Sequence, residues 1–172
     1  WLSLGATGVV DEDSAGDYRL YGTDATLMLP LATTVTAETA WTESLFDVSN
    51  RYELKDGFGW SLDLESHPTE KLQLGGFYRD LSDDFYNPSA VDVMRGTRKY
   101  GINAGYRLLP TLDIHGSYPD EKDDINDQDR RYGEVGAERT FERGKVFADI
   151  SYEDSTRQFV PPSSPGTRFP FD

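Results

Sequence analysis

The feature of this sequence that most constrains its fold is a repeated alternation of apolar and polar residues. Nine stretches of roughly ten residues show it, most clearly residues 58–65 and 100–108. Successive side chains of a β-strand point to opposite faces, so each stretch as a strand would have one apolar and one polar face. No stretch keeps the spacing of an amphipathic helix for more than about two turns. The alternation therefore predicts an all-β fold.

The predicted strands follow one another at fairly even spacing along the chain. The apolar face is weakest in the first stretch, which has few apolar residues, and in the eighth stretch, whose apolar residues are mostly small. In chain order, the stretches are residues 2–6, 21–29, 34–41, 58–65, 72–78, 100–108, 112–118, 131–141 and 146–152.

The connections between these stretches alternate between short and long. The short ones, each with a proline or a glycine, are residues 30–33, 67–70, 109–111 and 142–144, and the long ones are residues 11–17, 45–57, 81–96 and 119–130. Barrels of the outer-membrane type have short turns at the periplasmic rim and long loops at the outer rim. The order predicts an up-and-down antiparallel transmembrane β-barrel, or a segment of one, with about 8–9 strands.

Composition agrees with a barrel better than with a helical membrane protein. The hydrophobic content is 37% and the mean hydropathy is -0.62, and no apolar run approaches the roughly 20 residues of a spanning helix. A tilted spanning strand needs about 9–11 residues, which the stretches match, whereas strands of soluble proteins usually have about 5–6. Aromatic residues make up 13% of the chain and lie mostly near the ends of the stretches, as in interfacial aromatic girdles.

Strand number bears on whether the barrel is complete. The first and ninth stretches would run in the same direction and could close a barrel only by parallel pairing. Either residues 18–154 form eight strands with an N-terminal extension, or all nine stretches belong to a larger barrel. Because the chain begins at Trp1, inside a predicted strand, we expect a fragment or part of something larger. We assign residues 1–154 to the barrel wall and residues 155–172, with four prolines, to a Pro-rich tail or loop.

The polar faces of the predicted strands carry charges of both signs, which in a barrel would line the lumen. Asp24 belongs to this face, and the predicted lumen-lining residues are Glu38, Asp63, Glu65, Arg79, Lys99, Arg107, Asp113, Glu134, Glu138 and Asp149. An open pore and a barrel filled by paired side chains remain alternatives, since eight strands leave little room inside. The net charge of -14 argues against a nucleic-acid partner, which needs a basic surface.

Two patterns suggest specific chemistry, and each also has a simpler interpretation. Asp124, Asn126 and Gln128 have the one-three-five spacing of a calcium loop, but the glycine and the final glutamate of that loop are missing. We expect a solvated loop there. Asp113, His115 and Ser117 share one strand face, but alternate residues lie about 6.6 Å apart, too far for a catalytic relay. We predict no enzyme activity and no cofactor.

The segment GTRKYGINAGYRLLPTLDIHGSY, residues 96–118, reads as strand, tight turn and strand. Through it and the pattern of residues 1–154, the chain resembles Gram-negative outer-membrane β-barrel proteins of the porin-like kind. The resemblance implies a bacterial outer-membrane location, contact with the lipid bilayer and lipopolysaccharide, and a role as a channel or as a conduit or scaffold for a partner. Other outer-membrane or periplasmic subunits are among the partners it implies. The alternative is a soluble cell-surface antiparallel β-sheet or sandwich with a binding or structural role, which also buries every second residue.

Overall fold

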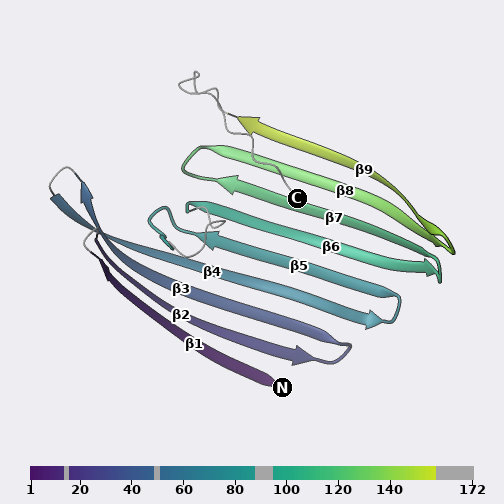
Figure 1. Cartoon of the computed structure of the whole chain (residues 1–172), viewed down its shortest axis with the longest axis horizontal. Coiled ribbons are helices and arrows are strands. Elements are labelled where there is room, and N and C mark those ends of the chain that lie inside the picture. The colour runs from purple at the N-terminus through teal and green to yellow at the C-terminus, as the bar shows by residue number, and fades with distance from the viewer. Residues whose placement is uncertain (14–15, 49–50, 88–94, 158–172) are drawn as a thin grey trace.

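The computed structural model describes residues 1–13, 16–48, 51–87 and 95–157, and these residues form a single nine-stranded sheet. Each strand pairs antiparallel with the next one along the chain, so the order in space is the order in sequence (Figure 1). The strands are β1 (Leu2–Asp13), β2 (Gly16–Leu29), β3 (Thr33–Val48), β4 (Arg51–Thr69), β5 (Leu72–Leu81), β6 (Thr97–Leu109), β7 (Leu112–Asp123), β8 (Gln128–Phe141) and β9 (Gly144–Arg157). The predicted all-β, up-and-down architecture is confirmed.

The sheet is open. Within the described residues, β1 pairs only with β2 and β9 only with β8. The pairing of β1 with β2 runs from Leu2 opposite Leu27 to Asp13 opposite Gly16. The opening stretch is therefore a full strand of the sheet, which contradicts the alternative that makes it an extension of an eight-stranded unit.

Most strands extend beyond the predicted boundaries at the long-loop end. β3 and β4 stay paired through Val48 opposite Arg51, inside the segment predicted as a loop of residues 45–57. β7 likewise runs to Asp123, and β8 begins at Gln128. At this end polar residues occupy both faces, so the alternation that marks the strand centres disappears although the backbone pairing continues. β9 reaches Arg157, and its last residues overlap the stretch assigned to the tail; residues 158–172 lie outside the described part.

The predicted short turns are confirmed. The β2–β3 turn has three residues between the paired Leu29 and Thr33, and it places Leu31 and Ala32 at φ of +62° and +46°, in the left-handed region that L-residues rarely adopt. Non-glycine residues accept this conformation at a cost of about 1–2 kcal/mol each. His67, predicted in the β4–β5 turn, instead lies in the last residues of β4, where the register shifts between Ser66 and Thr69.

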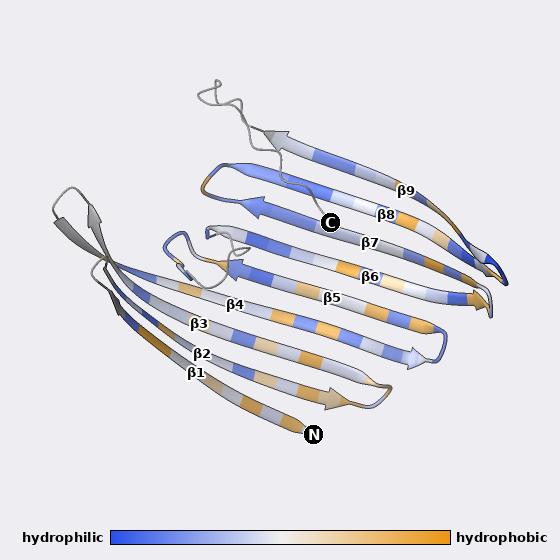
Figure 2. Cartoon of the chain, in the orientation of Figure 1, coloured by the Kyte–Doolittle hydropathy of each residue, from blue (hydrophilic) through white to orange (hydrophobic). Residues whose placement is uncertain are grey.

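The register places most of the large apolar side chains of the nine strands on one face. Leu27 pairs with Val35, which pairs with Leu64, and the same face continues through Ile102 on β6 and Ile150 on β9. Figure 2 shows hydrophobic and hydrophilic residues alternating along the strands. Among the described residues no second layer covers the apolar face, and Ile102 and Ile150 are 67% and 82% exposed. No helix in the described part of the chain has the length and apolar character to cross a membrane.

Candidate functional site

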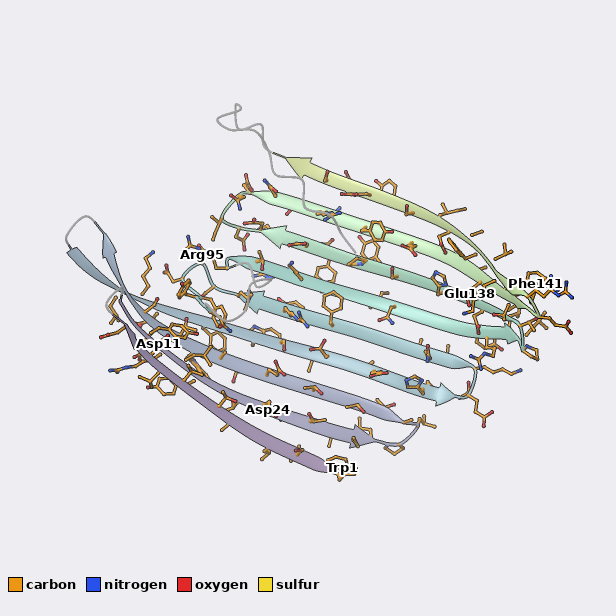
Figure 3. All side chains as sticks on the ribbon, viewed as in Figure 1. Trp1, Asp11, Asp24, Arg95, Glu138 and Phe141 are labelled. Carbon is orange, nitrogen blue, oxygen red and sulfur yellow. The ribbon has the colours of Figure 1, made fainter. Side chains whose placement is uncertain are left out.

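The opposite face of the sheet is polar, and the register places every predicted lumen-lining residue on it. One row runs from Glu38 through Ser61 to Arg79 and Lys99, each opposite the next. A second row near the short-turn end joins Arg107, Asp113 and Glu138; Figure 3 labels Glu138 there on β8 and Asp24 along β2. The remaining predicted residues that the register places on this face are Asp63, Glu65, Glu134 and Asp149.

Most charged residues of the polar face form ion pairs between neighbouring strands. Nitrogen and oxygen atoms lie 4.0 Å apart in Arg79–Asp63, 2.8 Å in Lys99–Glu121, 3.0 Å in Arg107–Asp113 and 2.6 Å in Lys145–Glu138. Their side chains are about one third to two thirds exposed, so each pair contributes about 0–1 kcal/mol to stability. The face is a hydrated surface of mixed charge rather than a packed core.

Glu121 and Lys145 complete two of these pairs, although the sequence analysis did not include them in the lumen-lining set. A third residue of the polar face, His115, has two acidic neighbours. Its Nε2 lies 3.7 Å from Glu134 Oε1 and 3.2 Å from Asp149 Oδ1. The sequence analysis considered His115 only with Asp113 and Ser117 along its own strand, whereas these contacts cross to β8 and β9.

At the long-loop end, the segment after β5 folds onto the polar face. Phe85 is only 6% exposed. The Tyr86 amide donates to Thr42 Oγ1 at 3.2 Å, and Lys55 Nζ lies 2.9 Å from Asp84 Oδ1. The ring of Tyr86 also meets that of Tyr18 edge to face, with centroids 5.8 Å apart. The segment of residues 82–86 therefore covers β2, β3 and β4 at one end of the polar face.

This packing depends on the glycine at position 57 of β4. A Cβ atom at Gly57 would overlap the backbone of Phe85, and backbone atoms cannot move aside as cheaply as the end of a side chain. Gly57 itself is buried beneath the segment. A glycine inside a strand often marks a close approach of another backbone, but the sequence pattern placed residue 57 in a predicted loop rather than in a strand.

The β7–β8 connection, which contains the one-three-five spacing of Asp124, Asn126 and Gln128, forms a turn held by local hydrogen bonds. Asp123 Oδ1 accepts hydrogen bonds from the backbone amides of Ile125 and Asn126 at 3.0 and 2.9 Å. Lys122 Nζ lies 2.6 Å from Asp124 Oδ1, and this hydrogen bond holds the pKa of Asp124 below its ordinary value. Local donors thus occupy the carboxylates of Asp123 and Asp124.

Comparison with known proteins gives one structural similarity to report. No protein-family model matches the sequence, and no curated protein matches it either. Among solved structures, the crystal structure of Acinetobacter baumannii OccAB2 matches 90% of this chain and 49% of its own, with 13% sequence identity and a TM-score of 0.46. The chain thus spans about half the length of that protein. At this TM-score, the similarity identifies neither a family nor an activity.

Proposed function

We propose that the sheet is a segment of the wall of an outer-membrane β-barrel, with its polar face lining a water-filled lumen through which small solutes or ions pass. The observation that carries the proposal is the uncovered apolar face. Its exposed large side chains include Leu4, Leu27, Leu62, Leu64, Ile102, Ile114, Val135 and Ile150. Soluble monomers rarely expose contiguous apolar patches above a few hundred Å², whereas lipid covers such a face in a barrel.

Aromatic side chains on the apolar face support a membrane boundary. Tyr21 pairs with Trp41, which pairs with Phe58, and the rings of Trp41 and Phe58 lie 5.3 Å apart. Trp60 stacks on Tyr78 with ring centroids 4.7 Å apart.

This aromatic row lies on the long-loop side of the apolar face. From the row to the short turns, β2 spans residues 21–29 and β6 spans residues 100–108, each about nine residues, which matches the length of a tilted spanning strand. We infer that the bilayer lies between the row and the short turns.

Closure of such a wall needs further strands at the outer edges of β1 and β9. Unpaired backbone groups at the edge of a sheet cannot be exposed to lipid without a large cost. The completing strands would come from elsewhere in the same protein or from a partner subunit.

The charge of the polar face suggests which solutes would pass. In the predicted lumen-lining set, acidic residues outnumber basic ones. The three basic residues, Arg79, Lys99 and Arg107, each lie beside a carboxylate. Rings of carboxylates favour cations in a pore. We therefore expect a cation preference, with the segment of residues 82–86 narrowing the lumen at the long-loop end.

Cysteine labelling provides a direct test because the chain contains no cysteine. Single substitutions at neighbouring positions sample the two faces of the same strand: Thr36→Cys and Asn103→Cys on the polar face, Ala37→Cys and Ile102→Cys on the apolar face. In outer-membrane vesicles, a small water-soluble maleimide should label the polar-face cysteines, and a lipid-soluble probe should label the apolar-face ones. Equal labelling of all four by the water-soluble reagent, or recovery of the protein in the soluble fraction without detergent, would favour the soluble sheet instead.

Conductance separates an open pore from a filled barrel. The protein with its completing strands, reconstituted in a planar bilayer, should give ion currents with a cation preference. A barrel that inserts but carries no current would leave the wall assignment intact and reject the channel, which would favour a conduit or scaffold for a partner.

A further inference from the structure

We propose that His115, Glu134 and Asp149 form a binding site for a divalent transition-metal ion of the Zn²⁺ class. The three residues come from the adjacent strands β7, β8 and β9, and one potential ligand atom from each lies within 4.8 Å of the other two. Among the described residues, no other group of three histidine or acidic side chains converges in this way. The site requires only a water-accessible polar face and does not rest on the proposed channel.

A glycine at the centre of the cluster allows the three side chains to meet. Gly136 is the register partner of both His115 and Asp149. A Cβ atom at Gly136 would overlap the Asp149 carboxylate and the His115 imidazole. The missing side chain therefore leaves the space into which these two groups reach from either side.

A neighbouring tyrosine orients the third side chain. The Tyr132 hydroxyl donates a short hydrogen bond to Glu134 Oε2, while Oε1 of the same carboxylate faces His115 Nε2. Metal sites in proteins commonly hold a ligating carboxylate by such an outer hydrogen bond, which fixes its orientation. Glu134 thus keeps one oxygen available for a metal ion.

Two of the three separations fit a small divalent cation, and the third, between the Glu134 and Asp149 carboxylate oxygens, is within 4.8 Å. Bonds of about 2.0–2.1 Å in tetrahedral geometry place ligand atoms about 3.3 Å from one another. His115 Nε2 lies 3.2 Å from Asp149 Oδ1 and 3.7 Å from Glu134 Oε1, close to that value. Three protein ligands would leave a fourth position for water.

The types of ligand indicate the class of metal. Imidazole nitrogen suits Zn²⁺, Cu²⁺, Fe²⁺ and Ni²⁺, whereas Mg²⁺ and Ca²⁺ prefer sites made of oxygen alone. The side chains of His115, Glu134 and Asp149 are 43%, 30% and 34% exposed, so an ion can enter from the polar side. A purely structural alternative is a protonated His115 held between two carboxylates, which would bind no metal.

The other histidine of the chain provides a matched control. His67 Nε2 lies 3.0 Å from Glu65 Oε1, and its side chain is 37% exposed, similar to His115. However, this pair belongs to no group of three ligands. If a metal bound simply to any exposed histidine with a carboxylate neighbour, the loss of either histidine would weaken its binding equally.

The test is a Zn²⁺ titration of the metal-free protein, in detergent or in plain buffer according to its solubility. We expect one saturable equivalent per chain that excess Mg²⁺ does not displace. His115→Ala and Asp149→Asn should each weaken binding at least tenfold, and His67→Ala should leave it unchanged. Gly136→Ala keeps all three ligands and should still weaken binding by about 10- to 100-fold, because the new methyl group displaces them.

Substitution with Co²⁺ adds a readout that reports the ligands themselves. Its visible absorption should appear with the wild-type chain, persist in His67→Ala and be lost in His115→Ala. No saturable Zn²⁺ binding, or equal weakening by His67→Ala and His115→Ala, would overturn the proposal. Because the titration requires neither a bilayer nor an ion current, its result is independent of the labelling and conductance tests.

Discussion

The two faces of this sheet are made by the same nine strands but meet opposite physical demands. On the apolar face, branched and aromatic side chains continue from strand to strand, and no layer of the described residues lies above them. On the polar face, charged residues pair across strands and remain partly exposed, except at one end, where residues 82–86 pack down onto them. The identity of each face therefore depends on register, since a slip of one residue would exchange the two sets of side chains.

The largest expected effect comes from placing a charge on the apolar face. Ala37 and Thr36 are neighbours on β3 that point to opposite faces; Ala37 pairs with Leu62, and Thr36 pairs with Asp63. In lipid, Ala37→Arg should cost about 2–4 kcal/mol of unfolding free energy, as for arginine near the middle of a barrel wall. Thr36→Arg should cost less than about 1 kcal/mol, because it gains a carboxylate neighbour. Urea unfolding in lipid vesicles measures both changes in unfolding free energy. Equal changes would mean that the two faces contact the same solvent.

The next effect concerns the one place where the polar face behaves like a packed core. Phe85→Ala should remove about 2 kcal/mol of local stability, because the ring is almost fully buried. The substitution should release the segment and expose it to protease while the strands stay paired. Ser82→Ala, at an exposed position of the same segment, is a milder control that removes one hydrogen bond to the Phe58 amide. Unchanged proteolysis of Phe85→Ala would show that the ring does not hold the segment.

A smaller effect tests the aromatic row on the apolar face. Trp60 and Tyr78 stack with an interplanar angle of 26°, and such pairs contribute about 0.5–1.5 kcal/mol beyond their burial. A double-mutant cycle of Trp60→Ala and Tyr78→Ala should give a coupling energy of about 1 kcal/mol. Additive losses would instead mean that each ring acts alone with lipid.

The smallest effect is expected from a single ion pair of the polar face. Arg107→Gln, which breaks the pair with Asp113, should change the unfolding free energy by less than about 1 kcal/mol because both side chains are about half exposed. The difference should shrink further in high salt, which screens exposed charges. A loss of several kcal/mol that is insensitive to salt would mean that this face is shielded from water, as in a barrel filled by side chains.

The centres of the strands could be predicted from sequence because apolar and polar positions alternate there. The strand ends could not, since at β3 and β4 the pairing continues to Val48 and Arg51 without the alternation. The packing of Phe85 against Gly57 joins segments far apart in the sequence, and the sequence pattern placed Gly57 in a loop rather than in β4.

The cluster around His115 was missed for a related reason. Its partners lie on β8 and β9. The residues that connect β7 to β8 carry no sequence signature that fixes the register of these two strands. Along β7 itself, alternate residues lie too far apart for a relay, but that spacing does not limit contacts with neighbours on other strands. The position of Gly136 was visible in the sequence, whereas its role as the gap between two ligands needed the register.

The odd number of strands in this open sheet limits how it can associate with copies of itself. In an up-and-down order, β1 and β9 point in the same direction. Two copies inserted in the same sense across a membrane would therefore bring β9 of one beside β1 of the other as parallel neighbours, at both seams. An all-antiparallel ring consequently cannot be built by repeating the nine described strands alone. Such a ring would need an odd number of further strands at each junction.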